Sequence, residues 1–212
     1  FDGLVLLGSC DKIVPGMLMA AARLEMPAIF LNGGPMYPAS YCGRHYDGNI
    51  VTEAIGWKQQ GRIDEEEFRH IEDIAEPCPG SCAMLGTANT MSALSESLGM
   101  SLMGSSTIPA VLAARMAKGV ETGEKIVELV QKGVTTRDIL TEEAFENAVM
   151  HLLTMGGSTN GILHLQAIYH EAGLGELPLS VFDEFSRRIP QVASIYPASE
   201  FDMVDFYEGG GV

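Results

Sequence analysis

The fold is decided by residues 4–32, which read LVLLGSCDKIVPGMLMAAARLEMPAIFLN. The apolar run at residues 4–7 predicts a buried strand, and the apolar run at residues 28–31 predicts a second one. Between the two runs, Pro15 suits the first turn of a helix that continues to about Leu24. A strand, a helix and a strand within about 30 residues form a βαβ unit, so we expect the two strands to be parallel neighbours.

The remaining sequence predicts mostly helices. Asp64 and Glu67 have the spacing of a capping box and predict the start of one helix. Residues 37–49 are rich in turn formers and predict a surface loop. Further helices are expected over residues 87–98, 108–118, 123–131, 141–156, 158–173 and 181–187, and a strand over residues 192–195. We therefore expect an α/β fold, with a parallel or mixed sheet flanked by helices in three layers and a helix-rich second half.

Composition excludes several classes of protein. The 212 residues include 13 basic and 28 acidic ones, and this net charge of −15 argues against a nucleic-acid partner. No apolar stretch approaches the roughly 20 residues of a membrane span. The four cysteines do not form a disulfide framework, so a reducing cytoplasm is expected. Because Phe1 already lies in a strand pattern and residues 209–211 are all glycine, we also expect a piece of a longer protein.

Cys10, Asp11 and Lys12 follow the first predicted strand, where open α/β sheets bind ligands. A thiolate suits iron and a carboxylate suits magnesium, so this trio predicts a metal site. The alternative is that Cys10 is a small buried hydrophobe and that the two charges are solvated. The apolar residues 13–15 instead suggest a covered loop, in which a lysine tends to lose its proton and can take up carbon dioxide as a carbamate.

Cys82 is the second candidate thiolate, because it lies just ahead of a predicted helix whose N–H groups favour a thiolate or a bound anion. Cys78 and Cys82 are separated by three residues, which is neither a zinc knuckle nor a thioredoxin motif. Cys42 and Cys78 are interpreted as spectators. His151, His164 and His170 fit helix surfaces or core edges, and none is assigned as a ligand.

The sequence GGSTN at residues 156–160 matches a nucleophile elbow only in part. That motif needs a final glycine and a preceding strand, whereas here Asn160 ends it and a helix is predicted before it. Ser158 is better interpreted as a helix cap, with N–H groups available to a substrate carboxylate. No dinucleotide-binding or P-loop motif is present.

Together the motifs resemble those of the dihydroxy-acid dehydratase / 6-phosphogluconate dehydratase family. The matching segments are CDKIVPGMLMAAAR at 10–23, GGPM at 33–36, GTANTM at 86–91, GGSTN at 156–160 and DFY at 205–207. The resemblance implies an iron–sulfur hydro-lyase, which converts a 2,3-dihydroxy acid to a 2-keto acid with the help of Mg²⁺.

The resemblance also implies a role for four residues of this chain. Cys10 and Cys82 match ligands of an iron–sulfur cluster, either 2Fe-2S or 4Fe-4S. Asp11 matches a magnesium ligand, and Lys12 matches a lysine that ligates magnesium as a carbamate. A third cysteine and a magnesium aspartate are expected upstream of Phe1, and a magnesium glutamate and the serine that accepts the proton beyond Val212. The chain would then be part of an amino-terminal domain, inactive alone, whose carboxyl-terminal domain is absent.

Two substrate classes remain open, and so does a different class of function. The segment at residues 11–23 favours branched-chain dihydroxy acids, with a homodimeric cytoplasmic enzyme as the expectation. Residues 83–86, AMLG, lean toward sugar-acid dehydratases. A non-catalytic assembly module is the alternative from another class, although such a module has no need for Cys10, Asp11, Lys12 and Cys82 together.

Overall fold

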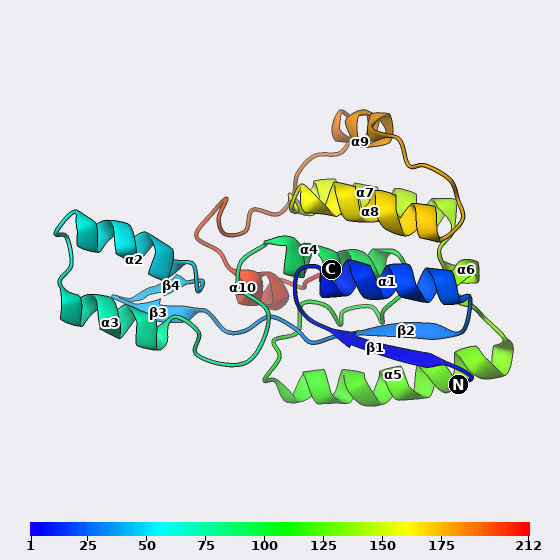
Figure 1. Cartoon of the computed structure of the whole chain (residues 1–212), viewed down its shortest axis with the longest axis horizontal. Coiled ribbons are helices and arrows are strands. Elements are labelled where there is room, and N and C mark those ends of the chain that lie inside the picture. The colour runs from blue at the N-terminus through cyan, green and yellow to red at the C-terminus, as the bar shows by residue number, and fades with distance from the viewer.

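The predicted βαβ unit is present in the computed structural model, which describes residues 1–212. Strand β1 (Leu4–Gly8) is followed by helix α1 (Ile13–Leu24) and strand β2 (Ala28–Asn32). The two strands are parallel, with Leu4 opposite Ala28 and Gly8 opposite Asn32. Helices lie on both faces of this small sheet: α1 covers one face and α5 (Ala113–Lys132) covers the other (Figure 1). The α/β class, the parallel pair and the three layers are thus confirmed.

The prediction that β1 is fully buried was wrong. Its exposure alternates along the strand, and Val5 and Leu7 are 46% and 61% exposed. β1 pairs with β2 alone and is an edge strand, so only the face carrying Leu4 and Leu6 packs against the core. β2 is buried nearly throughout, as predicted.

Helix α5 corrects a second prediction. Residues 108–118 and 123–131 were expected to form two helices, but a single helix runs without interruption from Ala113 to Lys132. Gly119 and Gly123 weaken a helix by about 1 kcal/mol each and do not break it, since neither removes a backbone donor. Val127, an apolar residue within the predicted helix 123–131, is exposed.

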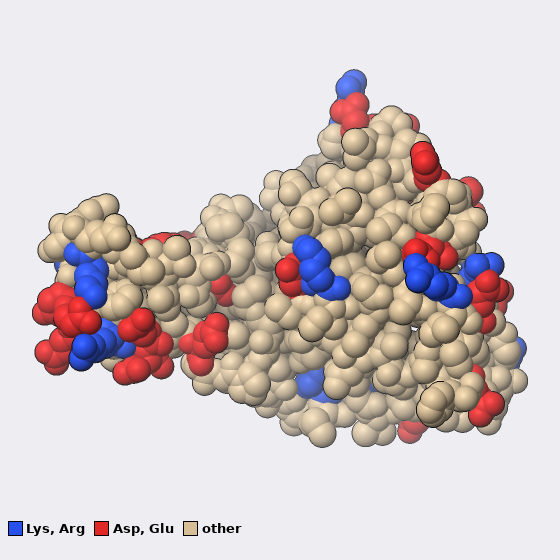
Figure 2. Space-filling model, in the orientation of Figure 1, with Lys and Arg blue, Asp and Glu red and all other residues tan.

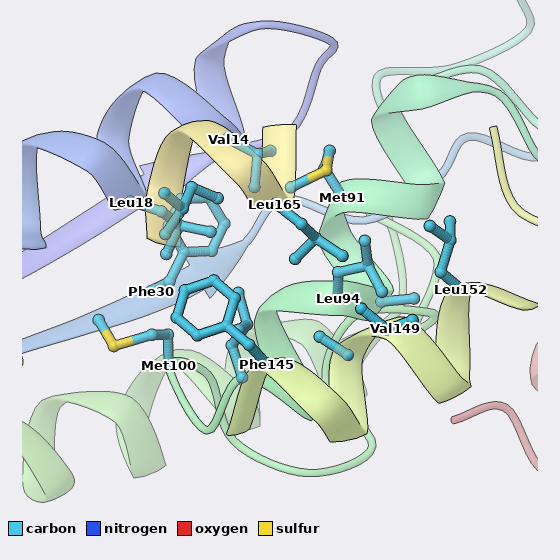
Figure 3. Packing of buried hydrophobic residues seen from close by; sticks show 14 of the residues in the cluster. Val14, Leu18, Phe30, Met91, Leu94, Met100, Phe145, Val149, Leu152 and Leu165 are labelled. Carbon is cyan, nitrogen blue, oxygen red and sulfur yellow. The ribbon is translucent and has the colours of Figure 1, made fainter. Parts of the chain in front are cut away.

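The main core lies between the sheet and the helices of the second half. Side chains from β2, α4 (Thr87–Ser97), α7 (Glu142–Met155) and α8 (Asn160–Glu171) meet there (Figure 3). The core cluster contains 25 buried residues, including Phe30 and Phe145. Each large apolar side chain buried in this way contributes about 1.5–3 kcal/mol. The inward faces of α4, α7 and α8 carry Leu94, Val149 and Leu165, which are fully buried.

A small lobe projects from one end of the molecule (Figure 1). It contains the antiparallel strands β3 (Ala39–Tyr41) and β4 (Arg44–Tyr46), so the predicted surface loop is in fact a hairpin. Helices α2 (Ile50–Gln59) and α3 (Glu65–Ile74) complete the lobe around a separate core of four buried residues, Ile50, Ala54, Ile71 and Ala75.

The predicted start of α3 is confirmed. Asp64 caps the helix by accepting a hydrogen bond from the N–H of Glu67 at 2.8 Å. The first turn carries Glu65, Glu66 and Glu67, and charged side chains gather on this end of the lobe (Figure 2).

The remaining elements are short. They are α6 (Thr136–Ile139), α9 (Leu179–Ser186) and α10 (Met203–Glu208). The strand predicted over residues 192–195 is absent, because the backbone N–H groups of Val192 and Ala193 bond to the carbonyl of Thr154 and do not join a sheet. None of the helices combines the length and the apolarity needed to span a membrane.

Candidate metal centre

Cys10, Asp11 and Lys12 lie in the turn that joins β1 to α1, at the carboxyl end of the strand. Asp11 has a φ of 33°, and the N–H of Ile13 donates to the carbonyl of Cys10 at 2.9 Å. All three side chains are exposed, that of Lys12 by 60%. The prediction of a covered loop was therefore wrong, because Ile13, which suggested cover, is itself exposed at the start of α1.

Cys82 reaches the same end of the sheet through backbone pairing. Pro35, just after β2, forms a parallel bridge with Ser81. The N–H of Met36 donates to the carbonyl of Ser81 at 2.8 Å, and the N–H of Ser81 donates to the carbonyl of Gly34 at 3.0 Å. This pairing places Cys82 beside the carboxyl ends of β1 and β2, where Cys10 also lies.

Only glycine fits at position 80, next to this bridge. Gly80 has a φ of 149°, and a Cβ atom there would lie 2.3 Å from the nitrogen of Met36. The backbones can approach each other, and Cys82 can reach the sheet edge, because that Cβ atom is missing.

The two cysteines line one open cavity of about 690 Å³. Asp11 and Asp47 also line it, and Thr87, Ser158 and Asn160 contribute polar groups. The carboxylate of Asp47 is buried, with 5% of the residue exposed. Its Oδ1 accepts from the N–H of Asn49 at 3.2 Å, and its Oδ2 accepts from the N–H of Met84 at 3.3 Å. Thiols and carboxylates that are far apart in the sequence thus face one space.

The electrostatics of Cys82 differ from the prediction. Burial raises the pKa of its thiol to about 11, and the nearby Asp47 and Cys10 add to the increase. The pKa of this thiol therefore shifts in the direction opposite to the one expected at a helix start. Cys82 lies in an irregular segment before α4, whose first residue is Thr87, and the field of a helix end falls off within one turn. A metal bound here would displace the thiol proton.

Lys12 has two polar neighbours. Its Nζ lies 3.2 Å from Oδ1 of Asp11 and 3.4 Å from Nε2 of His164 on α8. Burial, and then the charge of Lys12, lowers the pKa of His164. The imidazole is therefore uncharged at neutral pH and can accept a hydrogen bond from the ammonium group. The sequence interpretation of His164 as a core-edge residue is confirmed, and its contact with Lys12 is an addition to it.

The donor set fits the metals that the resemblance implies. Two free thiols suit iron, and the two carboxylates suit a hard cation. No three His, Cys, Asp or Glu side chains of residues 1–212 are grouped closely enough to hold an ion between them. The chemistry of the donors therefore fits shared ligation of an iron–sulfur cluster and of magnesium, and these residues alone do not complete either coordination sphere.

Cys42 and Cys78 do not line the cavity. Cys42 is exposed in the turn of the hairpin, with a φ of 48°. Cys78 is half-buried, and its Sγ accepts a hydrogen bond from the N–H of Tyr37 at 3.3 Å. Their assignment as spectators agrees with these positions.

Ser158 lies at the N-terminus of α8, as the sequence indicates. Its Oγ accepts from the N–H of Asn160 at 3.3 Å and lies 3.4 Å from Oγ1 of Thr87. The boundary residue of the helix is Thr159, one position later than predicted. No histidine or carboxylate bonds to Ser158, which agrees with its exclusion as an activated nucleophile.

Sequence reasoning missed two residues near the cavity, Asp47 and Asn89. Asp47 lies in a segment that was predicted to be a surface loop, so nothing in the pattern indicated its burial. Asn89 is one of several polar residues on α4, whose sequence is TANTMSALSES, so no contrast in the pattern marks it out. Its Nδ2 donates to the carbonyls of Cys82 and Met84.

Comparison with known proteins shows the family of this chain. The family model described as "Dihydroxy-acid/6-phosphogluconate dehydratase N-terminal" matches residues 1–212. The chain is 50% identical over 212 residues to the dihydroxy-acid dehydratases of Pyrococcus abyssi, Pyrococcus furiosus and Halothermothrix orenii. The match covers all of this chain and 38% of each relative. The chain therefore belongs to the dihydroxy-acid/6-phosphogluconate dehydratase family, and it corresponds to the family's N-terminal region.

Proposed function

We propose that the protein carrying this chain is a hydro-lyase, which removes water from a 2,3-dihydroxy carboxylic acid to give a 2-keto acid. The observation that carries the proposal is the convergence of Cys10, Asp11 and Cys82 on one cavity. Identity of 50% to dihydroxy-acid dehydratases supports it. An assembly module would not need two thiols and a carboxylate facing the same space.

Four residues would hold the metals. Cys10 and Cys82 would each give a thiolate to an iron–sulfur cluster, and Asp11 and the carbamate of Lys12 would bind Mg²⁺. When bound, these metals would supply the Lewis acidity that assists a poor hydroxide leaving group and stabilises enolate-like charge. The backbone N–H groups at the start of α8, near Ser158 and Asn160, are suited to orient a substrate carboxylate.

The favoured substrates are 2,3-dihydroxyisovalerate and 2,3-dihydroxy-3-methylvalerate, which would place the protein in branched-chain amino acid biosynthesis. The names of the relatives support a dihydroxy acid. A sugar acid, such as an aldonate or 6-phosphogluconate, is the second candidate because of the AMLG sequence after Cys82. Comparing turnover of dihydroxyisovalerate with turnover of an aldonate by the full-length protein separates the two.

Residues 1–212 would supply the cluster- and magnesium-binding part of an amino-terminal domain. The chain spans 38% of the length of its relatives, which supports a contribution from a further domain. We propose that this domain closes the site, that the protein is a homodimer in the cytoplasm, and that residues 1–212 alone do not turn over substrate. Measurable dehydration by residues 1–212 alone would contradict the last statement.

The ligand assignment is tested by iron and sulfide analysis of anaerobically purified full-length protein. We expect Cys10→Ser and Cys82→Ser each to lose most of the iron, whereas Cys42→Ser, a matched change outside the cavity, should keep it. Retention of the cluster by both cavity variants would refute the assignment. A wild-type protein with neither iron nor activity would favour the assembly module.

A further inference from the structure

We propose that Asn89 is a positioning residue for Cys82: its side-chain amide fixes the irregular segment 81–84, and thereby the place of the Cys82 thiol in the cavity. This inference rests on the proposed function, because that function gives the Cys82 thiol a cluster to bind. The observation behind it is independent of any metal, because it consists of three hydrogen bonds made by one buried side chain.

Asn89 uses both protons of its amide on the same segment. Its Nδ2 donates to the carbonyl of Cys82 at 2.6 Å and to the carbonyl of Met84 at 2.7 Å. Its Oδ1 accepts from the hydroxyl of Ser81 at 3.0 Å. The residue is 1% exposed, so water does not compete for these bonds. A buried amide with its donors satisfied in this way holds its partners firmly.

The segment has little else to hold these two carbonyls. Residues 82–86 belong to no helix or strand. Other elements hold the neighbouring groups: the N–H of Met203 bonds to the carbonyl of Ala83, and the N–H of Leu85 bonds to the carbonyl of Tyr196. The carbonyls of Cys82 and Met84 bond to Asn89. Asn89 therefore fixes the peptide that follows Cys82 and the peptide that follows Met84, and the first of these sets the direction of the Cys82 side chain.

These three hydrogen bonds require an amide side chain at position 89. Asparagine offers two donors and an acceptor in one planar group, and aspartate at neutral pH offers acceptors only. A carboxylate there would face two carbonyl oxygens without a proton between them. Asn89 also comes from α4, which packs in the main core, so the segment is tied to that core.

A purely structural role for Asn89 makes a different prediction from a positioning role. Loss of general stability would raise the reactivity of the half-buried Cys82 through global unfolding, and any variant destabilised to the same extent would show the same rise. Loss of positioning would change Cys82 alone, because Cys10 lies on a separate segment after β1 and makes no contact with Asn89 in the hydrogen-bond network. Cys82 is thus the reporter, the exposed Cys10 is the reference for the alkylation reaction itself, and a destabilised variant with its change away from the cavity is the control for stability.

The experiment measures alkylation of cluster-free full-length protein by iodoacetamide under anaerobic conditions, with the Cys10 and Cys82 peptides followed by mass spectrometry. In Asn89→Ala we expect Cys82 to react about tenfold faster, equivalent to about 1.4 kcal/mol of lost local order, with Cys10 changed less than about twofold. Because alanine is uncharged, the variant adds no charge that would change thiol reactivity.

Ser95→Ala is the matched control, since Ser95 is buried on the same helix and bonds to Asn32 and Ser101, away from the cavity. It should lower the melting temperature and leave the ratio of the Cys82 and Cys10 rates unchanged. Iron retained after anaerobic reconstitution should fall in Asn89→Ala and not in Ser95→Ala.

The proposal is overturned if the Cys82 rate rises equally in Asn89→Ala and in Ser95→Ala, or if it does not rise in Asn89→Ala. If that variant does not fold, Ser81→Ala decides, because it keeps both bonds of the Asn89 amide nitrogen and removes only the hydroxyl, which bonds to Oδ1 of Asn89 at 3.0 Å and to the carbonyl of Gly34 at 3.4 Å. A smaller rise in the Cys82 rate than in Asn89→Ala supports positioning, and an unchanged ratio of the Cys82 and Cys10 rates overturns it. Failure of the proposed function would give a different result. The wild-type protein would then bind no cluster, and Asn89→Ala would still raise the alkylation rate of Cys82.

Discussion

Replacement of Gly80 by alanine tests how the backbone brings Cys82 to the cavity. The new Cβ atom would lie 2.3 Å from the nitrogen of Met36 and 2.6 Å from the carbonyl carbon of Pro35, at a φ of 149°. Backbone strain of this kind costs about 1–3 kcal/mol, and weakening the two bonds of the Pro35–Ser81 bridge costs about 0.5–1.5 kcal/mol each. We expect the free energy of unfolding to fall by about 2–6 kcal/mol in total.

Urea denaturation of the cluster-free protein, followed by circular dichroism, measures this loss. Gly61→Ala is the matched control, because Gly61 also has a positive φ, 67°, and no atom lies within 4 Å of the place that an alanine methyl group would take there. That variant should lose about 1–2 kcal/mol from the left-handed conformation alone. If Gly80→Ala were no more destabilising than Gly61→Ala, the close approach of the two backbones would not be the reason that position 80 requires glycine.

Two further predictions concern the core and the Cys82 thiol. Phe145→Ala should lower the free energy of unfolding by about 3–5 kcal/mol, because it leaves a cavity in the main core; urea denaturation measures this, and a loss below about 1 kcal/mol would contradict the packing. The folded-state pKa of Cys82 is about 11, above the ordinary value of 9.0, so its contribution to stability is complete below pH 9 and is lost as the pH rises through 11. Denaturation of the metal-free protein at several pH values should show this decline, and the decline should be smaller in Cys82→Ser.

The βαβ unit and the apolar helix faces could be predicted because their signals are local. The apolar run around Phe30 predicts a strand, and the helical spacing of apolar residues around Leu94 and Val149 predicts two helices. The hairpin at residues 39–46 could not be predicted in this way, since its turn consists of Cys42 and Gly43 rather than the usual asparagine and glycine. Both residues adopt positive φ, of 48° and 73°, which the pattern does not indicate.

The candidate site was predicted from its motifs, and its environment was not. The meeting of Cys10 and Cys82 depends on a bridge between Pro35 and Ser81, a contact between segments that no local pattern indicates. The exposure of Lys12 and the burial of Asp47 depend in the same way on how the lobe and the helices surround the sheet edge. Burial and pKa are properties of the assembled chain, which is why the raised pKa of the Cys82 thiol could not be predicted from the sequence.

The small lobe gives the molecule two regions of unequal cooperativity. Its core contains four buried apolar residues, compared with 25 in the main cluster. Regions with few buried contacts open locally at a lower free energy than the global transition, as separate units of folding. The cavity wall formed by Asp47, Gly48 and Asn49 adjoins this weaker unit, whereas the wall beside α4 belongs to the stronger one. We therefore expect the wall beside the lobe to open by local unfolding at a lower free energy than the wall that carries Cys82.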